Sequence, residues 1–334
     1  PKTNAAVKVV PARDLWWQLI HTRAETGEPY IVNIDRCNEA MPDAQKNMGL
    51  KVHQSNLCSE ITLATDEERT AVCCLSSVNL EYFDEWKDVP TFIPDLIRML
   101  DNIIQHFVDN AVDTLPEPHF LMPNNIKEFM KYVKKEQKGF AKAAYSAFRE
   151  RALGLGAMGF HSYLQRNDIP YESVYAASFN NRAFKYIKEA AFLASLDLGK
   201  KRGEAPDMLG TGLRNSHLLA IAPNASSSII CGGTSPSIEP SRANVYTHKT
   251  LSGSFKVKNK YLEQLLESKN LNNEKTWRDI SAAEGSVEGI EELSEEEKAI
   301  FKTAPEINQM WVVDHAHQRQ KYICQSQSVN LFFV

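Results

Sequence analysis

The chain has 334 residues, and 38 lysines and arginines against 42 aspartates and glutamates give a net charge of −4. Hydrophobic residues make up 43% and charged residues 24%, a globular composition that argues against disorder, collagen and coiled coil. With no basic excess and no apolar run near the roughly 18–20 residues of a membrane span, we expect neither nucleic acid nor membrane as a partner.

The cysteines indicate a cytoplasmic protein with reduced thiols. They are too sparse for a disulfide scaffold, and none forms the C-x-x-C pair that is typical of a structural zinc site, so no bound metal is predicted. The six positions are Cys37, Cys58, Cys73, Cys74, Cys231 and Cys324.

Both ends of the sequence resemble cut ends. The chain opens on Pro1 without a Met and closes on an apolar run over residues 328–334. A terminal hydrophobic strand would expose an edge that invites pairing. We therefore expect a piece of a longer protein, or a split gene product that pairs with its other half.

Apolar spacing and turn residues predict the elements in chain order. The first part is expected to form a helix over 14–25, a buried strand over 30–34, a loop over 43–54, an extended segment over 56–63 and a strand over 71–80. Helices are then expected over 92–112, 125–133, 140–165 and 175–200, followed by a strand over 216–222, a loop over 223–237 and helices over 261–267, 295–303 and 306–322. Strands that alternate with helices predict an α/β fold with a largely parallel sheet or barrel.

The segment Asn56-Leu57-Cys58-Ser59-Glu60 carries the most chemistry. In an extended backbone, alternate side chains share a face, so Asn56, Cys58 and Glu60 are expected to point together while Leu57 and Ser59 pack against the scaffold. An amide, a thiol and a carboxylate would then meet in one small volume. The alternative is a half-buried strand in which the cysteine serves as a small hydrophobic residue.

Two further patterns are weaker. Cys73 and Cys74 would point to opposite faces of a strand, so one of them could exchange a disulfide with a partner; the alternatives are two core thiols or a strained vicinal disulfide. The small polar run Pro223-Asn224-Ala225-Ser226-Ser227-Ser228 follows a predicted strand and suits a phosphate, although spacing alone favours a simple serine-rich turn.

Gly154-Leu155-Gly156-Ala157-Met158-Gly159 matches the dinucleotide pattern G-x-G-x-x-G by spelling. That pattern requires a preceding strand, but residues 145–153 have a charged, helical pattern. We therefore interpret the glycines as sites of close helix packing. An NAD-dependent oxidoreductase remains a remote alternative that rests on this spelling alone.

Several segments, in the same order along the chain, resemble the large catalytic subunit of class I ribonucleotide reductase. The resemblance runs from about residue 14 to the last residue. The matching segments are residues 54–61, 71–77, 151–159, 212–216, 223–228, 237–240, 244–246 and 325–328.

The resemblance implies a ten-stranded α/β barrel, present in part, with a finger loop over about residues 53–64 that brings Cys58 to the centre. Residues 1–334 would all belong to one catalytic barrel domain, with no separate regulatory domain. Cys58 would be the transient thiyl radical that removes the 3′ hydrogen atom of the substrate, Glu60 would take the 3′-hydroxyl proton, and Asn56 would hydrogen-bond the ribose. Leu57 and Ser59 would complete the substrate-binding stretch of the loop.

The resemblance also implies a redox pair and partners. Cys73 would be one member of the redox cysteine pair, and residues Pro223 to Ser228 would hold the diphosphate of a ribonucleoside diphosphate. The second redox cysteine and the allosteric sites would precede residue 1, and the radical-relay tyrosines would follow residue 334. The chain would bind no cofactor itself: a metal-containing small subunit would supply the radical, and thioredoxin or glutaredoxin would supply reducing equivalents.

The leading hypothesis is thus a catalytic-barrel fragment of a ribonucleoside-diphosphate reductase, active only with the remaining large-subunit segments and the small subunit. A non-catalytic assembly partner with the same fold is the alternative from a different class. The intact set of Asn56, Cys58 and Glu60 weighs against it.

Overall fold

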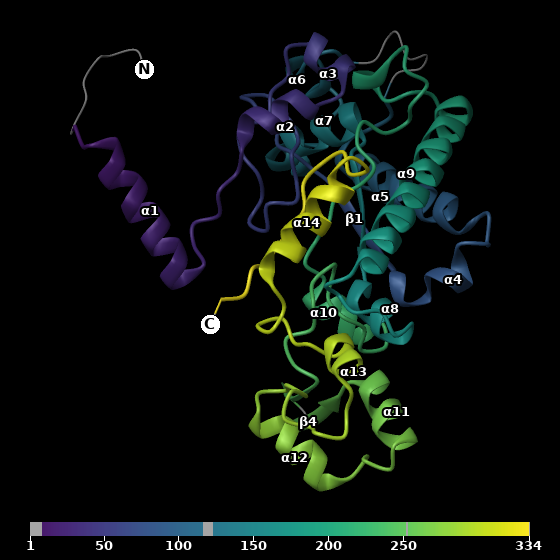
Figure 1. Ribbon diagram of the computed structural model, residues 1–334. Coiled ribbons are helices and arrows are strands. Elements are labelled where there is room, and N and C mark those ends of the chain that lie inside the picture. Colours follow the sequence, from purple (N-terminus) through teal and green to yellow (C-terminus); the bar gives the residue numbers. More distant parts are fainter. Residues whose placement is uncertain (1–8, 116–122, 252, 334) are drawn as a thin grey trace.

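The computed structural model describes residues 9–115, 123–251 and 253–333. Helices dominate the described residues (Figure 1). The helices and strands of the first half are, in chain order, α1 (Ala12–Thr26), α2 (Ile34–Ala40), α3 (Asp43–Asn47), β1 (Cys74–Asn79), η1 (Leu80–Tyr82), α4 (Phe83–Trp86), α5 (Phe92–Ala111), α6 (Ile126–Phe129), η3 (Lys135–Phe140), α7 (Ala141–Glu150), β2 (Leu153–Met158) and α8 (Phe160–Arg166). The second half contains α9 (Val174–Arg202), η4 (Pro206–Met208), α10 (Ala225–Ile230), β3 (Val245–Thr250), β4 (Gly253–Lys258), α11 (Lys260–Ser268), α12 (Glu274–Ala282), α13 (Glu295–Ile300) and α14 (Gln309–Gln320).

A parallel layer of extended segments forms the centre of the molecule. Strands β1 and β2 pair in parallel, with Cys74 opposite Leu153 and Asn79 opposite Met158. The layer continues through parallel bridges that join Leu155 to Leu219 and Ile221 to Gln327. The extended segment near residues 217–221 therefore lies beside β2, and the segment 325–328 lies beside it in turn, as in part of a parallel barrel.

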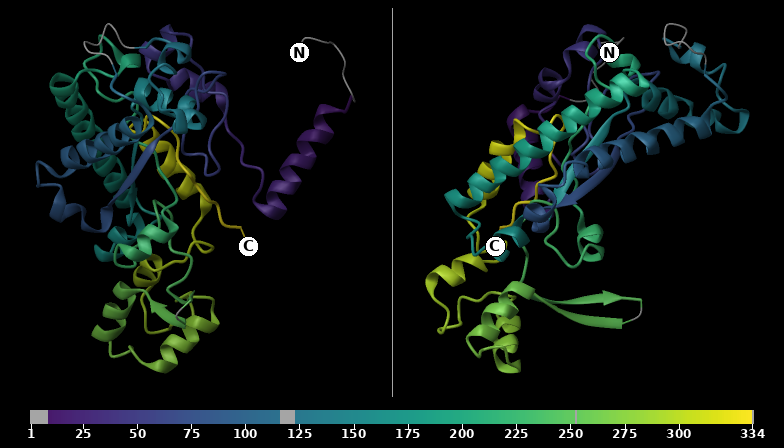
Figure 2. Two further views of the ribbon diagram at one scale, coloured as in Figure 1. Left: turned by 180° about the vertical axis from the view of Figure 1, so that it is seen from behind. Right: turned by 90° about the vertical axis from the view of Figure 1, so that its right-hand side faces the viewer.

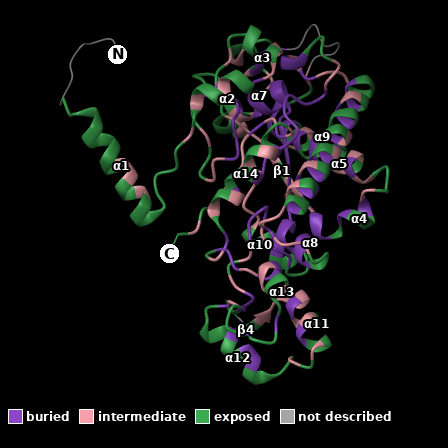
Figure 3. Cartoon of the chain, viewed as in Figure 1, coloured by how far each residue is buried: buried purple, intermediate pink, exposed green. Residues whose placement is uncertain are grey.

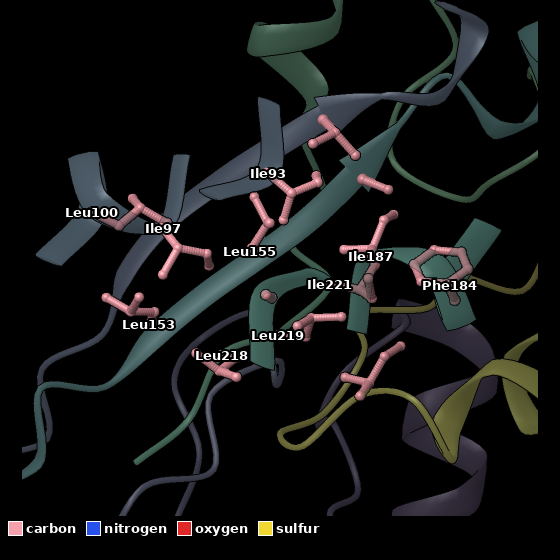
Figure 4. Close-up of a cluster of buried hydrophobic side chains, with 14 of the residues drawn as sticks. Ile93, Ile97, Leu100, Leu153, Leu155, Phe184, Ile187, Leu218, Leu219 and Ile221 are labelled. Atoms are coloured by element: carbon pink, nitrogen blue, oxygen red, sulfur yellow. The ribbon is translucent and has the colours of Figure 1, made fainter. Parts of the chain in front are cut away.

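Long helices cover one face of this layer. The apolar side chains of α5 recur at helical spacing, and Ile93, Ile97 and Leu100 are fully buried. They pack near Leu153 and Leu155 of β2, while side chains of α9 and of the segment 218–221 complete the cluster (Figure 4). Helix α9 begins where the Ser173 hydroxyl accepts the backbone N–H of Ala176 at 3.1 Å.

A smaller lobe has its own hydrophobic core. Its buried residues come from β3 through α13 and include Leu262, Leu266, Trp277 and Phe301. The antiparallel hairpin of β3 and β4 projects from this lobe (Figure 2). The prediction of one barrel domain over the whole chain stays a prediction.

Helix α1 lies apart from the rest of the chain and contributes no buried residue (Figures 1 and 3). Its exposed side chains include Leu15, Trp16 and Trp17. None of the helices in residues 9–115, 123–251 and 253–333 is long and apolar enough to cross a membrane.

Several of the predicted elements differ from the structure. Residues 30–33 form no strand and lead into α2, and α3 lies within the predicted loop over 43–54. The predicted helix over 140–165 is divided into α7, β2 and α8, because Arg151 adopts a left-handed backbone with φ 47° that ends α7. The segment 216–222 is extended but pairs only through isolated bridges.

Candidate active site

The finger loop (residues 53–64) contains a tight turn where the sequence predicted an extended strand. The backbone N–H of Ser59 donates to the carbonyl oxygen of Asn56 at 3.1 Å, and Ser59 has φ 64°. The expectation that Asn56, Cys58 and Glu60 share one face of an extended strand is therefore wrong. A turn replaces the strand because the Asn56 side chain accepts the backbone N–H of Ile61 at 3.2 Å and so holds the two arms together.

The turn nevertheless brings the Cys58 thiol under the influence of Glu60. Burial raises the pKa of Cys58, and the negative charge of Glu60 raises it further. Cys58 is partly buried, whereas Glu60 is only 2% exposed. Oε2 of Glu60 is buried and has no hydrogen-bond partner among the described residues. Asn56 and Leu57 are exposed at the tip of the loop.

Hydrogen bonds fix the loop to the parallel layer. The carbonyl oxygen of Glu60 accepts the backbone N–H of Ser326 at 3.0 Å. The backbone N–H of Thr62 donates to the side-chain oxygen of Gln325 at 3.2 Å, and the Ser55 hydroxyl donates to the carbonyl oxygen of Ile61 at 2.7 Å. The second arm of the loop is thus bonded to the layer, and the Ser55–Ile61 bond joins the first arm to the second.

A cavity of about 520 Å³ opens beside the loop. Cys58, Ser59 and Thr62 line it, together with Cys37 and Cys324 from distant parts of the sequence. A volume of this size accommodates a small-molecule ligand. Cys58 therefore lies at the wall of this hollow, whereas Asn56, Glu60 and Cys73 are not among its lining residues.

Cys73 lies immediately before β1, and its sulfur accepts a hydrogen bond from Nε2 of Gln325 at 3.3 Å. Burial raises the pKa of Cys73 to about 12, against the lowering effect of this hydrogen bond. Cys73 packs with Ile61 and Leu63, whereas Cys74 packs against the main core. The prediction that the two side chains point to opposite sides is confirmed, and both thiols are free.

The serine-rich segment after residue 222 forms a turn into α10. Asn224 has φ 57°; with its amide in the orientation that satisfies its neighbours, the side chain donates to the carbonyl oxygens of Ala222 at 2.9 Å and Ala157 at 3.2 Å. Its side chain therefore holds the turn against β2. Ser226 and Ser227 are exposed, and the buried Ser228 donates to the carbonyl oxygen of Ala225 at 3.1 Å. The predicted contacts of this segment with a diphosphate stay a prediction.

Gly154 and Gly156 of the glycine-rich motif lie within β2, and Gly159 follows the strand, so the interpretation as helix packing is wrong. Gly154 and Gly156 pair with Leu75 and Ser77 of β1 inside the sheet. A dinucleotide fingerprint needs these glycines in the turn after a strand, where the backbone approaches the pyrophosphate. Here the strand itself contains them.

Two residues at the site had no assigned role from the sequence. Gln325 belongs to the Gln-Ser-Gln-Ser segment, and its side chain contacts both Cys73 and the finger loop. Gly154 faces Cys73 across the β1–β2 pair. The only sequence signal was that both lie in motifs of the resemblance.

Comparison with known proteins yields one family throughout. The family described as "Ribonucleotide reductase, barrel domain" matches residues 2–211 and 207–334. The ribonucleoside-diphosphate reductase large subunit of Invertebrate iridescent virus 3 is 48% identical over all of this chain and 49% of its own length. The putative large subunit of Frog virus 3 is 45% identical over all of this chain and 55% of its own length.

A solved structure agrees with the sequence relatives. The class Id ribonucleotide reductase alpha subunit of Actinobacillus ureae superposes with a TM-score of 0.84 at 41% identity, covering 96% of this chain and 55% of that chain. The chain thus spans about half the length of the relatives it matches. It belongs to the ribonucleotide reductase large-subunit barrel family.

Proposed function

We propose that the chain is the catalytic-barrel portion of a class I ribonucleoside-diphosphate reductase, which reduces ribonucleoside diphosphates to 2′-deoxyribonucleotides. Membership of the family supports this. The observation that carries it is the position of Cys58, which lines a cavity and whose pKa is raised by its own burial and by the charge of the buried Glu60. The chain would act in the cytoplasm, together with the remaining large-subunit segments and a metal-containing small subunit that supplies the radical.

Cys58 would carry the hydrogen atom. Burial and the Glu60 charge both raise the pKa of Cys58, so the sulfur keeps its proton at neutral pH. A protonated thiol is a poor nucleophile but retains the S–H bond that hydrogen-atom transfer requires. As a thiyl radical, Cys58 would remove the 3′ hydrogen atom of the ribose and return one at the end of the reaction.

Glu60 and Asn56 would handle the sugar hydroxyls. The unpaired Oε2 of Glu60 would accept the 3′-hydroxyl proton, a role typically worth about 10²–10⁴ in rate. The side-chain oxygen of Asn56 is engaged by Ile61, so its amide nitrogen would donate to the ribose. Leu57 and Ser59 would flank the substrate in the same loop.

Cys73 and a second cysteine from another large-subunit segment would supply the electrons. One ribonucleotide and two thiols give one deoxyribonucleotide, one disulfide and one water, so each turnover consumes two electrons and two protons from the pair. Thioredoxin or glutaredoxin would reduce the disulfide. The turn from Pro223 to Ser228 would hold the substrate diphosphate through backbone N–H groups and the exposed hydroxyls of Ser226 and Ser227.

The test is turnover by the enzyme assembled from this chain, the remaining large-subunit segments and the small subunit. Cys58→Ser is expected to abolish deoxynucleotide formation and to retain binding of the ribonucleoside diphosphate. Cys231→Ser is the matched control, because Cys231 is an exposed thiol outside the loop. If Cys58→Ser turned over at the wild-type rate, the chain would be a non-catalytic assembly partner and the proposal would be wrong.

A further inference from the structure

The sulfur of Cys73 has a defined environment on two sides. Nε2 of Gln325 donates to the sulfur at 3.3 Å. On the β2 side, a Cβ built on Gly154 would lie 3.0 Å from the sulfur and would collide with a methyl group of Leu75. The absence of a side chain at Gly154 therefore leaves the space that the thiol occupies.

Gln325 is fixed by hydrogen bonds on every side. Besides its bond to Cys73, Nε2 donates to the carbonyl oxygen of Leu153 at 3.0 Å, and Oε1 accepts the backbone N–H of Thr62 at 3.2 Å. The backbone N–H of Gln325 donates to the carbonyl oxygen of Leu219 at 3.2 Å, and the residue is only 4% exposed. An amide held this firmly presents its N–H to the sulfur without having to reorganise.

We propose that Gln325 is a positioning residue for Cys73, holding its sulfur and stabilising it as a thiolate when the redox disulfide is reduced. This inference rests on the proposed function, in which Cys73 belongs to the redox pair. An amide donor favours the charged form of a thiol, and a thiolate is the group that leaves in thiol–disulfide exchange. Gly154 gives the sulfur room to lie within reach of the amide.

The assisted step is the first exchange with an external dithiol. A thiolate of the dithiol attacks the second redox cysteine, forming a mixed disulfide as the original S–S bond breaks. Cys73 departs with the electron pair as a thiolate, held by Nε2–H of Gln325, and then takes a proton from solvent. The second thiolate of the dithiol then attacks the first sulfur of the same dithiol, which is bonded to the second redox cysteine in the mixed disulfide. This step releases the second redox cysteine, so the dithiol ends oxidised and the redox pair reduced.

The test is the pH profile of Cys73 alkylation in the chain itself, followed by peptide mass spectrometry. All variants carry Cys74→Ala, so that alkylation of the peptide that contains residues 73 and 74 reports Cys73 alone. Gln325→Met removes the donor and is expected to slow alkylation about tenfold at fixed pH between 8 and 10, a displacement of about one pH unit. Gln325→Glu is expected to displace the profile further, because its carboxylate repels the thiolate.

Gln320→Met is the control for a loss of packing around Gln325 that leaves the hydrogen bond to the sulfur in place. Gln320 donates to the carbonyl oxygen of Gln325 at 2.9 Å but does not contact the sulfur. Its profile is expected to match that of the wild type. The inference is overturned if Gln325→Met matches the wild type, or if alkylation speeds up in the Gln325 variants.

The assembled enzyme separates this inference from the proposed function. Gln325→Met is expected to lower kcat/KM for the external dithiol about tenfold and to leave KM for the ribonucleoside diphosphate unchanged. A fall in substrate affinity alone would overturn the role of Gln325. Full turnover by Cys73→Ser would instead overturn the proposed function, whatever the alkylation profiles.

Discussion

The backbone N–H of Ser326 donates to the carbonyl oxygen of Glu60 at 3.0 Å, which joins the finger loop to the extended segment 325–328. Glu60 is nearly fully buried, so this hydrogen bond is shielded from water. The position of Cys58 therefore depends on a strand that is remote from it in the sequence.

Removing this hydrogen bond is expected to impair the loop without changing any reacting group. Ser326→Pro eliminates the N–H donor, and leaving a buried acceptor unpaired costs roughly 1–3 kcal/mol. We expect kcat/KM in the assembled enzyme to fall roughly 5- to 150-fold, since about 1.4 kcal/mol corresponds to a factor of ten. Ser326→Ala retains the N–H and should be close to the wild type; equal losses in both variants would contradict the assignment.

A buried ion cluster behind β2 is expected to contribute strongly to stability. The fully buried Asp101 contacts Arg151 at 2.7 Å, Arg202 at 2.9 Å and Arg214 at 3.4 Å. Burial alone would raise the pKa of Asp101, but these arginines hold it below its usual range. Asp101→Ala leaves buried guanidinium groups unpaired and should lower the free energy of unfolding by about 3–5 kcal/mol.

Chemical denaturation of the chain measures this loss. Asp95→Ala is the matched control, because Asp95 pairs with Arg98 at the surface, where such pairs contribute about 1 kcal/mol or less. If Asp95→Ala and Asp101→Ala lowered the free energy of unfolding by similar amounts, the buried cluster would contribute no more to stability than a surface ion pair.

His161 is expected to make the fold sensitive to acid. It is fully buried, its Nδ1 accepts the backbone N–H of Ser241 at 2.9 Å, and burial lowers its pKa to about 4. The unfolded chain therefore binds the proton more readily, with an ordinary pKa near 6.5. The stability linked to His161 is fully present above pH 6.5 and is lost as the pH falls towards 4.

Urea unfolding at pH 7.5 and pH 5 checks this sign. The loss of stability between the two pH values should be smaller in His161→Gln than in the wild type, by on the order of 2 kcal/mol. An unchanged pH dependence in His161→Gln would contradict a neutral, buried imidazole.

Long helices were predictable from the sequence, and short buried segments were not. The expected helices over 92–112 and 175–200 correspond to α5 and α9, because their apolar spacing and end signals agree. Strand β2 was predicted as helix because all its residues are buried, and a fully buried parallel strand lacks the alternation that identifies strands.

The geometry of the finger loop was not predictable from the sequence. The closeness of Cys58 and Glu60 was expected from an extended strand, yet a turn with a left-handed Ser59 creates it. Serine seldom adopts this backbone, so the sequence carries no signal for it. The contact of Gln325 with Cys73 depends on tertiary packing, which no local pattern encodes.

The most direct measurement is a single turnover of pre-reduced, assembled enzyme without an external dithiol, in which deoxynucleotide and alkylatable Cys73 are quantified together. The proposed function predicts that Cys73 becomes resistant to alkylation in step with deoxynucleotide formation, and that neither change occurs in Cys58→Ser. Deoxynucleotide formed by Cys58→Ser, or formed while Cys73 stays fully alkylatable, would contradict it.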